Sequence, residues 1–194
     1  MKKFKLRTLD VRKTYGNVVA LEAASIEMNE GEFLTLLGPS GSGKTTLLMA
    51  IAGINNPDSG EIWIDGKLAT YLPPFKRDLG MVFQNYALFP HMTIFDNIAF
   101  PLLMRKMDKT LIRKEIARVL EIVELDYVAK RFPRELSGGQ QQRIALARCI
   151  VYKPSIILMD EPLGALDKKL RGTLQREIKQ LHENLGITVL YVTH

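Results

Sequence analysis

The stretch Gly38–Thr46 reads GPSGSGKTT, and it follows EFLTLL at residues 32–37, a mostly apolar run. Residues 38–45 match the pattern G-x-x-x-x-G-K-[ST] in full. The preceding run has the length of a strand, and LLMAIAG after it has helical spacing and stops at Gly53. In this order, a strand, a glycine-rich turn and a helix N-terminus form a cradle of backbone N–H groups for phosphate. The stretch therefore predicts an α/β core with a nucleotide site.

We expect the cradle to hold the phosphates of a nucleotide together with Mg²⁺. The Lys44 ammonium would reach the β- and γ-phosphates, and the Thr45 hydroxyl would ligate Mg²⁺. The candidate phosphate-binding residues are Gly38, Pro39, Ser40, Gly41, Ser42, Gly43, Lys44, Thr45 and Thr46.

A second motif, IILMDE at residues 156–161, places two carboxylates directly after an apolar run of strand length. Asp160 would hold Mg²⁺, and Glu161 would act as the general base that activates the attacking water. An acidic pair after a strand is more often a helix cap when it stands alone. Together with the cradle, it indicates nucleotide hydrolysis.

A third motif, LSGGQ at Leu136–Gln140, is another glycine-rich stretch that opens a helix. Its candidate binding residues are Ser137, Gly138, Gly139 and Gln140. A hydroxyl, backbone N–H groups and a helix dipole form a second anion site there. An ordinary Ser-Gly-Gly helix cap explains the same five residues in isolation.

The spacing of apolar residues predicts the other elements. The first third reads as strands and turns, with a half-buried strand around Phe4, Leu6, Leu9 and Val11. Helices are expected from Thr93 to about Leu103, from Asp108 with an apolar stripe, from about 137 to Tyr152, and from about 166 to His182 with a stop near Gly186. The runs EFLTLL and SIILM favour a parallel sheet covered on both faces. We therefore expect a mainly helical lobe, residues 85–135, inserted into an α/β core.

Length and composition limit the possible classes of protein only broadly. A chain of 194 residues, 46% apolar and 25% charged, is expected to form one domain, and no apolar run is long enough to span a bilayer. The single cysteine, Cys149, lies among apolar residues and is expected to be buried and inert. A net charge of +6 permits a nucleic-acid or membrane-surface partner without requiring one.

The order of these motifs resembles the ATP-binding cassette of ABC transporters along essentially the whole chain. The resemblance rests on Tyr15, GPSGSGKTT, Gln84, LSGGQ, IILMDE, GALD at residues 164–167 and the terminal His194. It implies a P-loop NTPase core with a mainly parallel sheet, an N-terminal antiparallel β subdomain and an inserted helical subdomain. The cofactors it implies are ATP and Mg²⁺.

The same resemblance implies roles for four further residues. Tyr15 would stack on adenine, and Gln84 would reach Mg²⁺ or the attacking water. His194 would approach the γ-phosphate and support catalysis with Glu161, Gln84 and Lys44. Asp167 would cross the interface of a head-to-tail dimer, in which LSGGQ of one subunit closes over ATP in the cradle of the other.

The implied partners are a second ATPase subunit, transmembrane permease subunits and, indirectly, an extracytoplasmic solute-binding protein, with no nucleic acid. The likeness is greatest to bacterial importers of polyamines, iron(III) or sugars, with spermidine/putrescine the preferred solute. The subunit would then lie on the cytoplasmic face of the inner membrane. The alternatives are a cytosolic ABC ATPase that acts on nucleic acid or ribosomes, an exporter motor and, least favoured, a P-loop kinase.

Importer ATPases of this type continue beyond the histidine. We therefore expect residues 1–194 to be a C-terminally incomplete ATPase domain, with the next segment beside the closing strand, residues 187–193.

Overall fold

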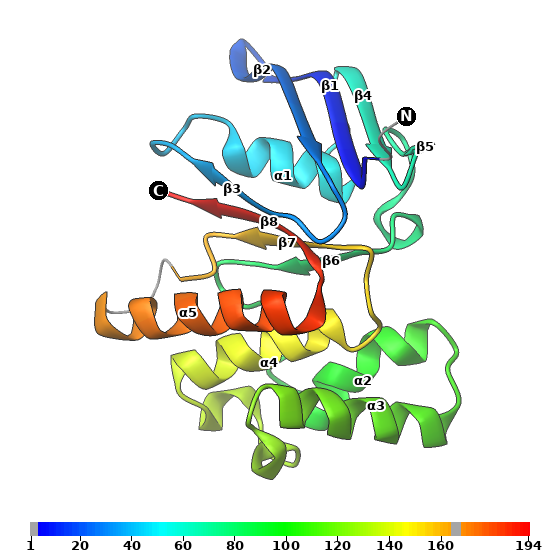
Figure 1. The fold of residues 1–194 in the computed structure, drawn as a ribbon, viewed down its shortest axis with the longest axis vertical. Coiled ribbons are helices and arrows are strands. Elements are labelled where there is room, and N and C mark those ends of the chain that lie inside the picture. The colour runs from blue at the N-terminus through cyan, green and yellow to red at the C-terminus, as the bar shows by residue number, and fades with distance from the viewer. Residues whose placement is uncertain (1–3, 164–167) are drawn as a thin grey trace. The chain divides into compact units, whose positions relative to one another are not determined.

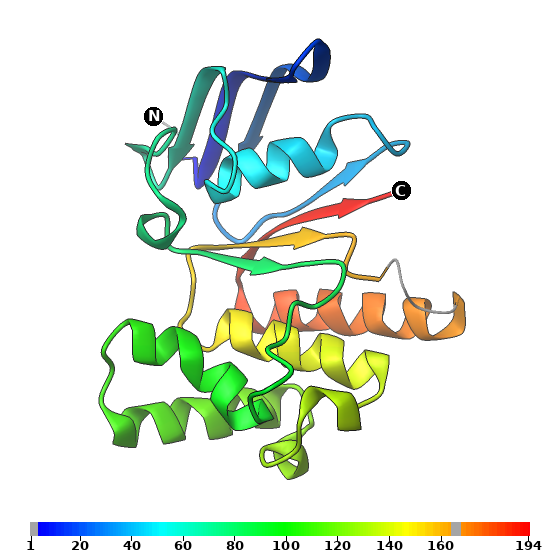
Figure 2. The same cartoon turned by 180° about the vertical axis from the view of Figure 1, so that it is seen from behind.

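The computed structural model describes residues 4–163 and 168–194, which form two compact units. The described residues of the first unit fall within Met1–Met81, Ser155–Glu161 and Glu177–His194, and those of the second within Val82–Pro154 and Pro162–Arg176. Figures 1 and 2 show the ribbon from two opposite sides. Within the described residues, no helix combines the length and the apolar character that a membrane span requires.

An antiparallel sheet forms the first layer of the first unit. It has the order β2-β1-β4-β5, with β1 at Leu6–Tyr15, β2 at Val18–Met28, β4 at Ser59–Ile64 and β5 at Lys67–Leu68. The pairing of β1 with β2 shifts register between Thr8 and Val11, where Asp10 has a φ of 47°. Leu6, Thr8 and Val11 are therefore the fully buried positions, and the predicted alternation is interrupted by this irregularity.

A second sheet has the order β3-β8-β7-β6, with β3 at Phe33–Leu37, β6 at Leu79–Val82, β7 at Ile156–Asp160 and β8 at Thr188–Thr193. Strand β8 pairs in parallel with both β3 and β7. All five residues of β7 are buried, whereas Leu37 of β3 is 75% exposed. The prediction of full coverage on both faces is wrong for β3, because β3 is the outer strand of this sheet. Strands β3 and β7 occupy both hydrogen-bonding edges of β8, and the expectation of a further segment packed beside the closing strand stays a prediction.

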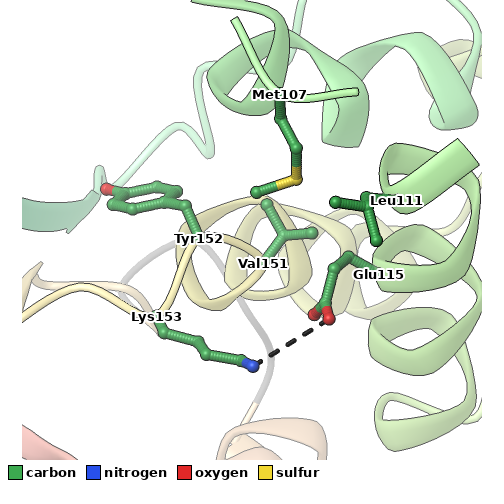
Figure 3. A pocket seen from close by; sticks show the side chains of 6 residues that line it. All are labelled: Met107, Leu111, Glu115, Val151, Tyr152 and Lys153. Atoms are coloured by element: carbon green, nitrogen blue, oxygen red, sulfur yellow. Dashed lines mark ion pairs between the residues drawn. The ribbon is translucent and has the colours of Figure 1, made fainter. Parts of the chain in front are cut away.

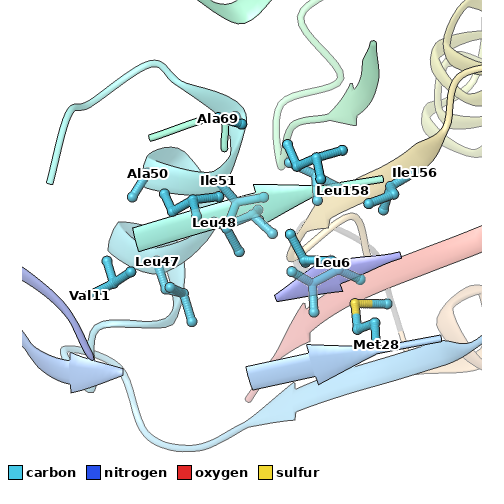
Figure 4. Packing of buried hydrophobic residues seen from close by; sticks show 14 of the residues in the cluster. Leu6, Val11, Met28, Leu47, Leu48, Ala50, Ile51, Ala69, Ile156 and Leu158 are labelled. Atoms are coloured by element: carbon cyan, nitrogen blue, oxygen red, sulfur yellow. The ribbon is translucent and has the colours of Figure 1, made fainter. Parts of the chain in front are cut away.

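Helix α1, Lys44–Ala52, packs between the two sheets of the first unit (Figures 1 and 4). Leu47, Leu48 and Ile51 of α1 belong to one buried cluster with side chains from both sheets; these include Leu6, Val11, Met28, Ile62, Ile156, Leu158, Leu190 and Val192. Burying a leucine or isoleucine side chain contributes roughly 1.5–3 kcal/mol. This packing fixes α1, and with it the glycine-rich loop from which α1 begins.

Three packed helices make up most of the second unit: α2 at Ile94–Met104, α3 at Lys109–Ile122 and α4 at Gly138–Ile150. The Thr93 hydroxyl accepts from Asp96 N, and the Asp108 carboxylate accepts from Thr110 N, so both predicted helix caps are confirmed. The predicted apolar stripe of α3 is buried, and it consists of Ile112, Ile116, Val119 and the adjoining Val123. Short 3₁₀ turns lie at Pro74–Lys76 in the first unit, and at Asp126–Val128 and Pro133–Glu135 in the second.

The ends of α4 and α5 compare differently with the sequence expectation. Helix α4 ends at Ile150, before Tyr152, and Lys153 then adopts a left-handed φ of 55°. Helix α5 spans Lys168–Leu185, slightly beyond His182, and the predicted stop near Gly186 is confirmed, because Gly186 at a φ of 61° ends the helix. The limits of the predicted helical lobe, 85–135, stay a prediction.

Candidate nucleotide site

Candidate site residues follow three strands of the parallel sheet in the first unit, all at the carboxyl ends of those strands. The register pairs Leu37 of β3 with Thr193 of β8, and Asp160 of β7 with Val192 of β8. The carboxyl ends of parallel strands meet at one edge, which is where open α/β sheets bind ligands. The cradle after β3, Glu161 after β7 and His194 after β8 therefore start from neighbouring positions.

Left-handed glycines shape the cradle. Gly41 and Gly43 have φ values of 82° and 87°, a region that side chains with a Cβ rarely adopt. A Cβ at Gly43 would lie 2.5 Å from the carbonyl oxygen of Ala20 in β2, so only glycine fits there. The Lys44 ammonium lies against the loop, where it donates to Gly38 O at 2.7 Å, Pro39 O at 2.8 Å and Ser42 Oγ at 3.2 Å.

The N-terminus of α1 has no side-chain cap. Its N-cap is Gly43, no side chain accepts from the first N–H groups, and no acidic residue lies in the first turn. The exposed tip of the loop, Ser40–Ser42, precedes this helix start directly. Unsatisfied N–H groups and the positive end of a helix dipole attract anions. The helix start thus suits a phosphate group.

A side-chain oxygen of Thr45 and one of Asp160 lie within hydrogen-bond distance of each other. Thr45 Oγ1 donates to Asp160 Oδ1 over 2.8 Å, and Asp160 is only 9% exposed. Burial raises the pKa of the Asp160 carboxyl, the hydrogen bond from Thr45 opposes that rise, the charge of Glu161 adds to it, and Lys44 opposes it. A hydroxyl and a carboxylate are oxygen ligands of the kind that Mg²⁺ prefers. This pair therefore fits the predicted metal.

Glu161 and His194 meet at the end of the sheet. Glu161 Oε2 lies 3.3 Å from His194 Nδ1, and Glu161 N donates to Val192 O over 3.1 Å. Glu161 has a φ of 43°, which is uncommon for a residue with a side chain and is found at functional sites more often than elsewhere. The contact orients the imidazole with one nitrogen against a carboxylate and leaves the other nitrogen for a ligand.

Tyr15 stands at the end of β1 in the same unit and is 48% exposed. Its hydroxyl accepts a hydrogen bond from Asn55 Nδ2, and the Lys13 ammonium lies over its ring. The family resemblance implied a role for Tyr15, but nothing in the sequence indicated these neighbours. Asn55 is 40 residues away along the chain, and no local motif marks it.

Gln84 and LSGGQ belong to the second unit. Gln84 is exposed in a turn just after β6. At the start of α4, the Ser137 hydroxyl accepts from Gln140 N over 3.3 Å, while Gln140 Oε1 accepts from Ser137 N over 2.9 Å. The S-x-x-Q spacing was the signal for this reciprocal capping box. Asp167 lies outside the described residues, and the roles of Gln84 and LSGGQ stay predictions.

The second unit also has a pocket of about 130 Å³ (Figure 3). It is lined by Met107, Leu111, Glu115, Val151, Tyr152 and Lys153, with Lys153 Nζ 3.9 Å from Glu115 Oε1. None of the candidate site residues lines it. Cys149 lies two residues before Val151 in the chain. It is buried as predicted, and burial raises the pKa of its thiol to about 12.

Comparison with known protein families decides the class. A family model described as ABC transporter matches residues 21–164, which is most of the chain. The chain belongs to the ABC transporter family. The predicted family is thereby confirmed, and the likeness to a solved ABC transporter cassette confirms the predicted fold.

Two curated relatives are import ATP-binding proteins by name. The trehalose/maltose import ATP-binding protein MalK of Thermococcus litoralis is 51% identical over 97% of this chain and 52% of its own length. The spermidine/putrescine import ATP-binding protein PotA of Nitrosomonas eutropha is 52% identical over 97% of this chain and 52% of its own length. The chain spans about half the length of the curated relatives it matches.

A solved structure supports the same class. The ATP-binding cassette MJ0796, in a dimeric post-hydrolysis state bound to ADP and Pi, is 37% identical to this chain, with a TM-score of 0.84. The match covers 97% of this chain and 88% of MJ0796.

Proposed function

We propose that this ABC ATPase chain binds and hydrolyses ATP to energise solute import across the cytoplasmic membrane. The observation that carries the proposal is the group formed by the cradle, the Thr45–Asp160 pair and the Glu161–His194 pair at one edge of a sheet. Phosphate-binding N–H groups, oxygen ligands for a metal and a carboxylate base are the parts that phosphoanhydride hydrolysis requires.

The chain's own residues divide the chemistry. The cradle and Lys44 hold the phosphates, and Thr45 and Asp160 hold Mg²⁺, which neutralises phosphate charge when bound. Glu161 accepts a proton from the attacking water. The imidazole of His194, held by Glu161, stabilises the charge that develops on the γ-phosphate. Tyr15 stacks on the adenine ring, and Gln84 reaches the metal or the water.

We further propose a head-to-tail dimer in which Ser137, Gly138, Gly139 and Gln140 of one subunit contact the nucleotide of the other, with Asp167 at the interface. The dimeric state of the similar cassette MJ0796 supports this assembly. The site in the first unit and the second helix start at Ser137 would then serve two different nucleotides.

The proposed partners are transmembrane permease subunits, with an extracytoplasmic solute-binding protein acting through them, at the cytoplasmic face of the inner membrane. The names of the import relatives support this assignment. We propose a polyamine as the solute, as in the spermidine/putrescine relatives; the sugar relative has nearly the same identity, so sugar is the competing solute. Uptake of labelled spermidine and of labelled maltose, in cells with and without the gene for this protein, separates the two.

The test of the ATP site is thermal unfolding with and without millimolar Mg-ATP. Ligand present at 100 times its dissociation constant stabilises a folded chain by about 2.7 kcal/mol. We expect a clear rise in the unfolding temperature of the wild-type chain and none in Lys44→Ala. A wild-type chain whose unfolding temperature does not move would refute the proposal.

A further inference from the structure

Three residues that the proposed site does not use restrain Tyr15, either at its side chain or through the residues just before it. Lys13 precedes it on β1, and Asn55 and Asp58 lie in the loop between α1 and β4. Asn55 Nδ2 donates to the Tyr15 hydroxyl over 2.9 Å. This bond fixes the outer end of the ring.

One face of the ring has a cation beside it. The Lys13 ammonium lies over the Tyr15 ring, 5.6 Å from its centroid. The same ammonium donates to Asp58 Oδ1 over 2.8 Å, which keeps it in place. Since Tyr15 remains 48% exposed, the ring keeps accessible surface away from this lysine.

Asp58 fixes the backbone that carries the ring. Its Oδ2 accepts from Thr14 N and from Thr14 Oγ1, each at 2.6 Å, and its own N–H donates to Arg12 O over 2.8 Å. The hydrogen bond from Lys13, followed by those from Thr14, holds the pKa of the Asp58 carboxyl well below its usual range. The carboxylate is therefore ionised at neutral pH and holds β1 directly before Tyr15.

These contacts also connect the ring to the phosphate cradle. Asn55 N donates to Met49 O in α1, the helix that begins at the cradle. A helix of 9 residues spans roughly 13 Å. Asn55 at one end of α1 and Lys44 at the other are thus attached to one rigid element.

We propose that Asn55, Asp58 and Lys13 are positioning residues that hold the Tyr15 ring ready for a purine base on the face opposite Lys13. The inference rests on the proposed ATP site. A ring that is already fixed loses less conformational freedom when the base stacks on it, so its restraint raises affinity for the base and not for the phosphates.

Calorimetric titration with two probes tests this role. Mg-ATP reports base and phosphates together, and magnesium tripolyphosphate reports the phosphates alone. For Asn55→Ala we expect ATP affinity about threefold to tenfold weaker, the usual effect of one hydrogen bond, and unchanged affinity for tripolyphosphate. The matched control is Asn56→Ala, because the exposed Asn56 side chain makes no hydrogen bond with the described residues. Unchanged ATP affinity in Asn55→Ala, or equal losses for both probes, would overturn the inference.

A double-mutant cycle tests whether Asn55 acts through Tyr15. Tyr15→Phe and Asn55→Ala remove the same hydrogen bond, so the double variant should lose no more ATP affinity than either single variant. Additive losses would contradict the proposal.

Asp58→Asn removes the charge and keeps the shape of the side chain. We expect weaker ATP binding, unchanged tripolyphosphate binding and no further loss in a Tyr15→Ala background. Equal losses for both probes would mean that Asp58 supports the fold and not the ring.

The outcome also separates this inference from the proposed function. If the wild-type chain does not bind Mg-ATP, or Lys44→Ala binds it normally, the proposed function fails. If Lys44→Ala abolishes binding and Asn55→Ala binds ATP like the wild type, only the positioning role fails.

Discussion

The chain begins two of its helices with glycine-rich motifs, and these two helix starts differ in how their backbone is satisfied. Helix α1 starts from Gly43 with no side-chain cap. Helix α4 starts from Ser137, which forms a reciprocal capping box with Gln140. In sequence both starts predict an anion site, yet only α1 leaves its first N–H groups without a capping side chain.

The difference teaches that a glycine-rich helix start is not by itself a complete phosphate site. At α1 the N–H groups are available because left-handed glycines form the loop and no side chain takes their place. At α4 the Ser137 oxygen already accepts from Gln140 N, but its hydroxyl hydrogen remains available to donate. We therefore expect α1 to bind nucleotide in its own chain, and α4 to contribute through the Ser137 hydroxyl to the nucleotide of a partner chain.

The largest expected effect is on the rate of ATP hydrolysis, with no change in the nucleotide binding assigned to the start of α1. Glu161→Gln removes the proposed base while keeping the shape of the side chain, so phosphate release should fall by a factor of about 10² to 10⁴. Mg-ATP affinity should stay near the wild-type value, because the cradle is unchanged. Wild-type turnover in Glu161→Gln would assign the base to another residue.

The cradle itself can be broken at one glycine and spared at another. Gly43→Ala combines a left-handed φ with a contact of 2.5 Å to Ala20 O, so we expect a loss of more than about 2 kcal/mol in unfolding free energy and weaker ATP binding. Gly41→Ala has the same left-handed φ, but a Cβ at Gly41 would meet no atom within 4 Å outside the adjoining residues. This variant should lose only about 1–2 kcal/mol in unfolding free energy. Urea unfolding of both variants checks the order. Equal losses would show that the contact with Ala20 is unimportant.

The capped start of α4 is tested by removing its capping side chain. Ser137→Ala removes the cap, and we expect about 1 kcal/mol less unfolding free energy by urea denaturation. ATP hydrolysis should fall as well if Ser137 acts on the partner's nucleotide. A variant that hydrolyses ATP at the wild-type rate would restrict Ser137 to its capping role.

For the last prediction we expect no reaction of the Cys149 thiol in the folded chain. Cys149 lies buried in α4, and burial raises the pKa of its thiol to about 12, so little of the thiol is ionised at pH 8. A thiol reagent at pH 8 should not label the folded chain, with or without Mg-ATP, and should label it fully in urea. Labelling that changes with Mg-ATP would show that nucleotide alters the packing of α4.

The elements that local chemistry specifies were predictable. The cradle, the caps at Thr93 and Asp108 and the end of α1 at Gly53 follow from glycine conformation and side-chain capping. The family follows from the order of several such motifs.

Features that depend on distant parts of the chain could not be predicted. The exposure of Leu37 depends on which strand lies at the edge of the sheet, and the restraint of Tyr15 depends on a loop 40 residues away. The pairing of β1 with β4 brings that loop beside Tyr15, and no short motif encodes such a pairing.

The comparison of the two helix starts is tested most directly by calorimetric titration of Mg-ATP into the dilute chain, its Lys44→Ala variant and its Ser137→Ala variant. We predict one Mg-ATP per wild-type chain, affinity at least about 100-fold weaker in Lys44→Ala, and affinity within about twofold of wild type in Ser137→Ala. Normal binding by Lys44→Ala, or loss of binding in Ser137→Ala, would contradict the assignment of the nucleotide to the uncapped start of α1.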